Sequence, residues 1–231
     1  MIKKHFSDPF WEKVTLSYLS SKHLAFGEKF EFLDEDALSF ECKEKIKGTK
    51  ILMMGSGNGS NFEELILKLS PYQVQFLGLF CDNPQASIIK RAKKLNIPVT
   101  YPRSKLKKKQ LNERVEKFLS PPFDLVVLAG YMRILPPDIV RPLLGKIINI
   151  HPSLLPDFRG LNAVQRAINA NVEYIGVSVH LIDEDIDQGT LLSQAKFPLA
   201  KVKKRDIMQA IHNIEHRLYF DTILRLLSKQ A

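Results

Sequence analysis

Short apolar runs alternate with amphipathic segments from Thr49 onward, and this alternation limits the fold more than any other feature of the sequence. The apolar runs have the length of buried strands, and the segments between them have helical spacing. The run at residues 124–129 is continuous enough in apolar residues to be buried on both faces of a sheet. Strands that alternate with helices favour a Rossmann-like α/β fold, with a mostly parallel, twisted sheet and helices on both faces. We expect strands at residues 50–54, 73–80, 99–101, 124–129, 147–150, 176–182 and 191–197, and helices near 61–69, 85–95, 107–119, 161–170 and 204–227.

The 231 residues suffice for one large α/β domain or two small ones, and a segment of different character precedes the main α/β pattern. Residues 1–48 are rich in charge, and several of their apolar side chains recur at helical spacing: Phe6, Phe10, Trp11, Val14 and Tyr18. We therefore predict an N-terminal extension over residues 1–48, helical and packed on the core, followed by the main domain over residues 49–231.

Basic residues cluster in three runs, at residues 90–94, 105–109 and 201–205, and the net charge is +9. Such runs are usually solvated helix faces, although they also attract anionic small molecules or nucleic acid. No aromatic side chains are interleaved with the lysines, which argues against a platform for single-stranded nucleic acid.

The chain has two cysteines, Cys42 and Cys81. Two are too few for a disulfide framework or a zinc site and fit a reducing cytoplasm. No stretch approaches the ~20 apolar residues of a membrane span, and no apolar segment of a secretory signal follows the N-terminus. We predict a cytoplasmic protein without a membrane partner.

A glycine-rich turn, Gly55-Ser-Gly-Asn-Gly-Ser-Asn61, follows the first strand of the main domain. Glycines let the backbone approach a ligand closely, and the helix N-terminus beyond them suits a phosphate. The turn lacks the last glycine of a dinucleotide fingerprint and the Gly-Lys-Ser/Thr of a P-loop. Asp82, after the second strand, keeps a ribose-binding role in a dinucleotide site open, and a plain tight turn is the structural alternative.

Two polar side chains, Asn149 and His151, lie on one face at the end of the apolar run 146–150, which Pro152 stops. In open α/β sheets ligands bind at the carboxyl ends of the strands. Asp187 follows another apolar run, so an amide, an imidazole and a carboxylate could together stabilise an oxyanion and move a proton. The acidic residues 183–187 could instead form a surface turn or bind a metal, although their spacing is weak evidence for a metal.

Two further segments border these candidates. Ser178 and His180 share one face of a strand, where His180 is either a hydrogen-bond partner of the site or a core residue. In Gly130-Tyr-Met-Arg-Ile-Leu135, apolar residues around Arg133 could line a pocket for a flat heterocycle. The alternative is an ordinary connection with Arg133 in solvent.

Taken together, these segments resemble the folate-dependent formyltransferase family, most closely its members that act on glycinamide ribonucleotide. The matching stretches occur in family order with family-like gaps, and the resemblance covers residue 49 to the end. They are Gly57-Asn-Gly-Ser-Asn61, Leu128-Ala-Gly-Tyr-Met-Arg-Ile-Leu135, Asn149-Ile-His-Pro-Ser-Leu-Leu-Pro156, and Ser178-Val-His180 through Asp187 and Gly189.

The resemblance implies a transfer of the formyl group of 10-formyltetrahydrofolate to the amine of glycinamide ribonucleotide in purine synthesis, without a metal. It implies that Asn149, protonated His151 and Asp187 are catalytic, with Ser178 and His180 behind them. It further implies phosphate binding by Gly59, Ser60 and Asn61, other substrate contacts by Pro152 and Glu215, and folate contacts by Met132, Arg133, Leu135, Ile182, Asp183 and Asp185. We expect residues 49–231 to form the catalytic domain. We also expect the protein to be a monomer or a homodimer, with small-molecule substrates and no nucleic-acid partner.

Three features depart from the family pattern and keep other acceptors open. Residues 158–166 look more like methionyl-tRNA formyltransferase, Gln188 replaces a common glycine, and His212 stands where the family often has glutamine. The chain ends near its terminal helix, without the extra C-terminal domain of the tRNA enzymes. The alternatives are therefore a formyltransferase with a sugar-nucleotide or methionyl-tRNA acceptor, a formyltetrahydrofolate deformylase, and, from a different class, a basic nucleotide-binding module without catalysis.

Overall fold

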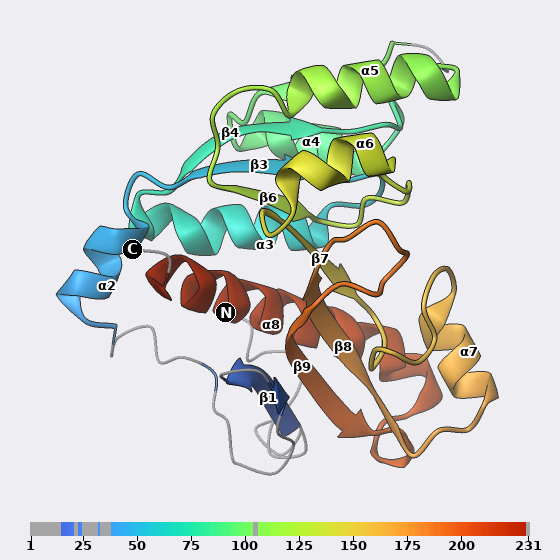
Figure 1. Cartoon of the computed structure of the whole chain (residues 1–231). Coiled ribbons are helices and arrows are strands. Elements are labelled where there is room, and N and C mark those ends of the chain that lie inside the picture. The colour runs from blue at the N-terminus through green and yellow to red at the C-terminus, as the bar shows by residue number, and fades with distance from the viewer. Residues whose placement is uncertain (1–14, 21–22, 25–31, 33–37, 104–105, 230–231) are drawn as a thin grey trace.

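The computed structural model describes residues 15–20, 23–24, 32, 38–103 and 106–229, and its strands form one mixed sheet. Nine strands in the described residues run in the order β2-β1-β9-β8-β7-β6-β3-β4-β5 (Figure 1). The neighbouring strands β7, β6, β3, β4 and β5 are parallel to one another. The strands β8, β9, β1 and β2 extend the sheet beyond β7, and each pairs with its neighbours in antiparallel orientation. The strands are β1 (Thr15–Ser20), β2 (His23–Leu24), β3 (Lys50–Met54), β4 (Gln75–Phe80), β5 (Val99–Thr100), β6 (Leu125–Leu128), β7 (Ile147–His151), β8 (Tyr174–Leu181) and β9 (Leu191–Pro198).

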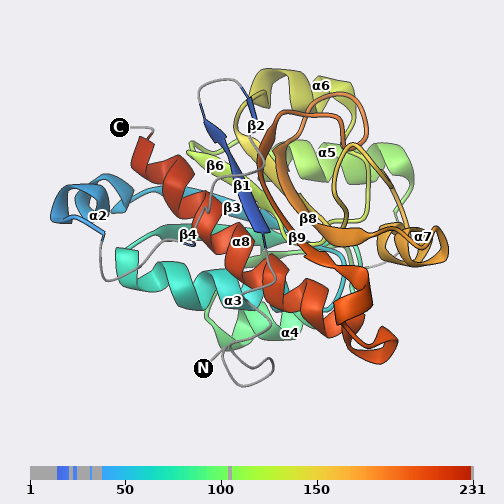
Figure 2. The same ribbon diagram turned by 90° about the horizontal axis from the view of Figure 1, so that it is seen from below.

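Helices cover both faces of the sheet, which confirms the predicted α/β architecture (Figures 1 and 2). The helices α3 (Ser60–Leu69), α4 (Ser87–Lys94) and α8 (Ile207–Lys229) bury their apolar side chains in one core, and α5 (Lys108–Phe118) and α6 (Pro137–Val140) in a second core on the other face. The remaining α-helices are α2 (Phe40–Ile46), which packs on α8, and α7 (Ala163–Asn169). Short 3₁₀ helices lie at Ser70–Tyr72, Arg141–Leu143, Leu199–Lys201 and Lys204–Asp206.

The central strands position the functional residues. All four residues of β6 are buried, as expected of a strand covered on both faces. Met54 of β3 pairs with Leu128 of β6, which pairs with Asn149 of β7, so the carboxyl ends of these strands share one edge. The buried Tyr219 hydroxyl of α8 donates to the Leu128 and Ile148 carbonyl oxygens, at 3.1 and 3.0 Å, and ties α8 to this edge.

The N-terminal extension departs from its predicted helical structure. Residues 15–20 form β1, which pairs with β9, and residues 23–24 form β2. In the described part of the extension, the only helix is α2. Four residues of the predicted helical pattern, Phe6, Phe10, Trp11 and Val14, lie outside the described residues. Tyr18 is therefore a strand residue. The helical prediction was wrong here because β1 is set by pairing with a strand almost 180 residues further along the chain, which local spacing does not report.

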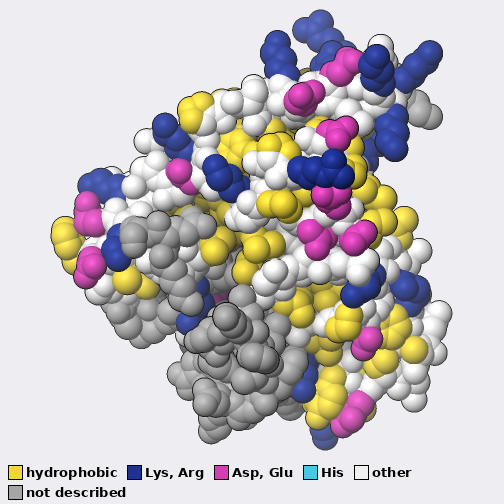
Figure 3. Space-filling model, in the orientation of Figure 1, with side chains coloured by type: hydrophobic (Ala, Val, Ile, Leu, Met, Phe, Trp, Pro, Cys, Tyr) yellow, Lys and Arg dark blue, Asp and Glu magenta, His cyan; other side chains and the backbone are white. Residues whose placement is uncertain are grey.

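The basic runs lie mostly on the surface. Lysine and arginine side chains gather over α5 (Figure 3), where Lys107, Lys108, Lys109, Arg114 and Lys117 are exposed. These basic side chains therefore form a solvated face of α5. In the part of the chain that the structure describes, no helix is long and apolar enough to cross a membrane.

Candidate active site

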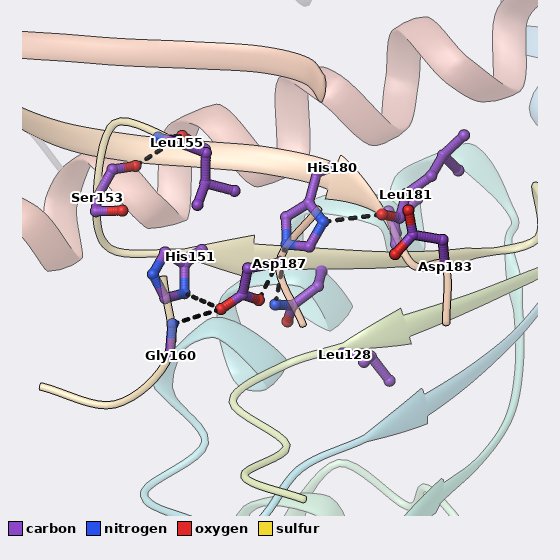
Figure 4. A network of polar contacts seen from close by, with 12 residues as sticks. Leu128, His151, Ser153, Leu155, Gly160, His180, Leu181, Asp183 and Asp187 are labelled. Carbon is purple, nitrogen blue, oxygen red and sulfur yellow. Dashed lines mark hydrogen bonds and ion pairs between the residues drawn. The ribbon is translucent and has the colours of Figure 1, made fainter. Parts of the chain in front are cut away.

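His151 and Asp187 meet at the carboxyl end of β7 (Figure 4). Asn149 joins them through His180, which contacts both Asn149 and Asp187. Asn149 and His151 alternate with apolar residues on β7, so their side chains share one face, and Asp187 comes from the loop between β8 and β9. Asp187 lies between two imidazole rings: its Oδ2 is 3.4 Å from His151 Nδ1, and its Oδ1 is 3.5 Å from His180 Nε2. The predicted constellation of amide, imidazole and carboxylate is thus present.

His180 stands behind this group and orients Asn149. It faces Asn149 across the β7–β8 ladder, and its Nδ1 donates to the Leu181 carbonyl oxygen at 2.8 Å. Its Nε2 then faces Nδ2 of the Asn149 amide, 3.3 Å away. One N–H of the Asn149 amide is used in this contact, and the other is left for a ligand.

Ser178 holds the loop that follows His151. Its hydroxyl accepts from the Leu155 amide at 3.0 Å and donates to the Ser153 carbonyl oxygen at 2.6 Å. Gln194 Nε2 donates to the same hydroxyl at 2.8 Å and to the Leu155 carbonyl oxygen at 2.9 Å. Because all these groups are buried and satisfied, the loop has a fixed path beside His151.

The charges of Asp187 and His151 follow from their surroundings. Burial acts to raise the pKa of Asp187, but the contact with His180, the hydrogen bond from the Gly160 amide and the nearby His151 ring lower it to about 2. Burial lowers the pKa of His151 below its usual value, although Asp187 and the Phe158 carbonyl favour the charged ring. The lowered pKa favours the neutral His151 ring in the free protein, whereas the sequence led us to expect a protonated ring.

The glycine-rich loop lies two strands away, at the end of β3. A Cβ on Gly55 or Gly59 would come within 2.5 Å of the Ile88 side chain, so both positions require glycine, and Gly59 also has a φ of +83°. Gly59 caps α3 without a side-chain hydrogen bond, which leaves amides of its first turn open to a ligand. Arg91 fixes the loop through the Asn58 carbonyl oxygen, at 2.9 Å, and an ion pair with Glu63.

Asn61 in the first turn of α3 contacts Glu215 on α8. Asn61 Nδ2 donates to Glu215 Oε2 at 3.1 Å. Glu215 is 7% exposed, and burial raises the pKa of its carboxyl to about 7, against the lowering effect of the Asn61 hydrogen bond. The structure thus brings together Asn61 and Glu215, two predicted substrate-binding residues from distant parts of the chain.

Comparison with known proteins identifies relatives of this chain. The family described as Formyl transferase matches residues 49–223. Phosphoribosylglycinamide formyltransferase of Bacillus subtilis (strain 168) is 38% identical over 184 residues, which cover 77% of this chain and 94% of that protein. The crystal structure of phosphoribosylglycinamide formyltransferase from Bacillus halodurans superposes with a TM-score of 0.70 at 34% identity, over 79% of this chain and 97% of that one. The structure from Anaplasma phagocytophilum also has a TM-score of 0.70, at 31% identity over 80% of this chain and 89% of that one.

The chain belongs to the formyl transferase family.

The loop after β6 holds the residues of this formyl transferase that were expected to contact a heterocycle. The Met132 side chain is 67% exposed, while its amide donates to Ser56 Oγ at 2.9 Å. Arg133 pairs with Asp82 Oδ2 at 2.5 Å, and both residues line a surface pocket while the Arg133 side chain stays exposed. Leu135 is buried in the second core, at 6% exposed, which leaves its side chain little surface for a ligand.

The loop after β8 and the residue after His151 hold the other predicted contacts of the formyl transferase. Ile182, Asp183 and Pro152 are half-buried, and Asp185 is exposed. Asp183 Oδ1 accepts from the Asp185 amide at 3.1 Å, which shapes the turn that leads to Asp187. Among the described residues, no group of three or more His, Cys, Asp or Glu side chains is placed to hold a metal ion.

Arg166 was missed from the sequence, and Asp82 was considered only for a ribose-binding role. Arg166 of α7 bonds the loop beside His151, and Asp82 pairs with Arg133. Both act through tertiary contacts, and the sequence signal available was slight: Arg166 lies in the segment that departs from the family pattern, and Asp82 follows a strand.

Proposed function

We propose that this formyl transferase moves the formyl group of 10-formyltetrahydrofolate to the amine of glycinamide ribonucleotide in purine biosynthesis. The observation that carries the proposal is the edge shared by the glycine-rich loop after β3 and by Asn149 and His151 at the end of β7. Neighbouring strands lie about 4.8 Å apart, so a ligand that joins the two places spans roughly 10 Å. A small phosphorylated amine has this length. The names of several relatives support the same acceptor.

In the proposed reaction, the amine attacks the formyl carbon and gives a tetrahedral carbon with a negative oxygen. The bond from that carbon to N10 of the folate then breaks, and a proton passes from the amine to N10. We assign Asn149 as the donor to the negative oxygen, because one N–H of its amide is not used by His180. A donor in this position contributes about 10²–10³ in rate.

We assign the proton transfer to His151, with Asp187 as its partner. A neutral His151 can take up the proton of the attacking amine at Nδ1, and Asp187 Oδ2, 3.4 Å from Nδ1, stabilises the imidazolium. The proton then returns to N10 as the folate leaves. The low pKa of Asp187 keeps its carboxylate charged throughout this cycle.

Binding is assigned to the rest of the predicted site. The amides and side chains of Gly59, Ser60 and Asn61 would hold the phosphate at the N-terminus of α3, with Glu215 and Pro152 contacting the remainder of the ribonucleotide. The folate would contact the two loops next to the triad, through Met132, Arg133, Ile182, Asp183 and Asp185, and through the backbone of Leu135, whose side chain is buried.

The rest of the organisation is part of the same proposal. We take residues 49–231 as the catalytic domain and residues 1–48 as an extension that is not needed for the chemistry. Cys42 and Cys81 are free thiols, which supports a cytoplasmic location.

The test uses the purified full chain with 10-formyltetrahydrofolate and glycinamide ribonucleotide, and follows the loss of the formyl folate by absorbance. The proposal expects turnover that requires the ribonucleotide and disappears in His151→Ala. Turnover without any amine would instead identify a deformylase. Turnover only with methionyl-tRNA or an amino-sugar nucleotide would overturn the acceptor but keep formyl transfer, and inactivity with every acceptor would favour a binding module.

A further inference from the structure

The loop at residues 157–162 contacts both His151 and Asp187. The Phe158 carbonyl oxygen lies 3.1 Å from His151 Nε2. The Gly160 amide donates to Asp187 Oδ2 at 2.8 Å (Figure 4). Three residues of this loop have positive φ: Phe158 at 55°, Gly160 at 76° and Asn162 at 57°. Since non-glycine residues adopt such angles at a cost, other contacts must hold the loop in this path.

Arg166 of α7 supplies those contacts. Its Nη2 donates to the Phe158 carbonyl oxygen at 2.8 Å and also to the Arg159 carbonyl oxygen, and its Nε donates to the Leu161 carbonyl oxygen at 3.1 Å. The guanidinium also lies 5.9 Å from the centre of the Phe158 ring. One planar group thus binds three carbonyl oxygens of the loop, which a lysine ammonium could not do with the same geometry.

The shared Phe158 oxygen connects Arg166 to the proton on His151. A carbonyl oxygen only accepts, so the contact at 3.1 Å requires a hydrogen on His151 Nε2. In the neutral ring Nδ1 then has the lone pair, and this nitrogen faces Asp187. A proton can be gained only at Nδ1, beside the carboxylate that stabilises it.

We propose that Arg166 is a positioning residue for formyl transfer, which holds the Phe158 carbonyl against His151 Nε2 and thereby keeps the neutral ring in the Nε2–H tautomer. The inference rests on the proposed role of His151 in the reaction. It also gives a function to the segment at residues 158–166, which departs from the family pattern.

Arg166 also acts on His151 through its charge. The groups that face His151 are Asp187, the Phe158 carbonyl, His180 and Arg166. Asp187 and the carbonyl favour the charged ring, whereas His180 and Arg166 disfavour it and lower the pKa of His151, in addition to burial. Loss of Arg166 should therefore raise the pKa of His151, while a lysine at this position should largely preserve it.

The test is nitrogen-15 NMR of the imidazole rings in the full chain, over a range of pH, for the wild type and for Arg166→Met, Arg166→Lys and Gln165→Met. The His151 signals are assigned by their loss in His151→Ala. Gln165 is the matched control, since it is exposed on the same helix and bonds only to Asn169 among the described residues. Formyl transfer is measured in parallel as kcat and KM.

The wild type and Gln165→Met should show the Nε2–H tautomer at high pH. Arg166→Met should show a mixture of tautomers, a higher titration midpoint for His151, and a kcat lower by about tenfold to a hundredfold, because a misplaced catalytic group loses rate steeply. Arg166→Lys should also mix the tautomers but keep the wild-type midpoint, and it serves as the test if Arg166→Met does not fold.

An unchanged tautomer in both Arg166 variants would overturn the inference, and so would a mixture already present in the wild type. These outcomes are separate from the failure of the proposed function. If His151→Ala turns over normally, the role of His151 is wrong whatever the spectra show. If His151→Ala is inactive and the Arg166 variants match the wild type in spectrum and kcat, only the inference about Arg166 is wrong.

Discussion

The two halves of the site differ in how far their polar groups are already satisfied. In the triad half, Asp187 contacts His151, His180 and the Gly160 amide, and the other nitrogen of each ring bonds a backbone carbonyl. In the half around α3 and α8, the buried atoms Asn61 Oδ1, Asn213 Nδ2 and His216 Nε2 have no hydrogen-bond partner among the described residues. Buried polar atoms are normally paired, so this second half is the part that a ligand would complete. The hydrogen bonds of the triad are therefore already formed in the free protein, whereas those around α3 and α8 are not all formed.

The largest effects should come from the triad half. His151→Ala and Asp187→Ala should each lower kcat by about 10²–10⁴, the usual contribution of a positioned acid or base. Binding of the ribonucleotide should change little, because neither side chain lies near the glycine-rich loop along the sheet edge. Steady-state kinetics of purified variants, with Asn112→Ala on the distant α5 as control, would measure this. Near-normal kcat in either triad variant would remove that residue from the mechanism.

Glu215 should give the next largest effect, on stability and not on rate. Both states of the protein bind its proton below pH 4.5, but between pH 4.5 and about 7 only the folded state keeps it, so the carboxyl destabilises the fold as the pH rises. A pKa raised from 4.5 to about 7 corresponds to roughly 3 kcal/mol.

Denaturant unfolding of the wild type and Glu215→Gln at pH 5 and pH 7.5 measures this difference. Asp187 and His151 titrate alike in both proteins, so their contributions cancel. The glutamine variant should gain relative stability at the higher pH. A constant difference between the two proteins would show that Glu215 has an ordinary pKa.

A substitution of Asn61 tests the half of the site around α3 and α8, and its expected effect on kinetics is smaller. Asn61→Ala should raise KM for glycinamide ribonucleotide by about tenfold, the equivalent of one or two lost hydrogen bonds, and leave KM for the formyl folate unchanged. The same kinetic assay measures both constants, and Asn112→Ala again serves as control. An effect on the folate alone would place Asn61 in the other substrate site.

The smallest effect is expected from the extension. Removal of residues 1–45 should leave kcat and both KM values within about twofold, since β1 lies beyond β9, on the side of the sheet away from the parallel strands. The pairing of β1 with β9 should still contribute to stability, so the melting temperature should fall. Loss of activity in a truncated chain that remains folded would give the extension a role in the site.

The sequence predicted the parts of the fold that local pattern controls. The apolar run before Asn149 predicted β7 and the shared face of Asn149 and His151, and the glycines after residue 54 predicted the turn into α3. That Asp187 reaches His151 could be expected from the resemblance but not from spacing, since a 35-residue excursion separates the two positions. Arg166 and the Asp82–Arg133 pair were missed because no local pattern reports which loop a long cationic side chain reaches. The strand β1 was predicted as helix for a related reason, because its partner is β9.

One comparison tests the central claim most directly: kcat and KM for glycinamide ribonucleotide, measured in one assay for His151→Ala and Asn61→Ala. The account predicts that His151→Ala loses kcat with little change in KM and that Asn61→Ala raises KM with little change in kcat. If the two variants change the same constant in the same way, the division into a preassembled catalytic half and a ligand-completed binding half is wrong.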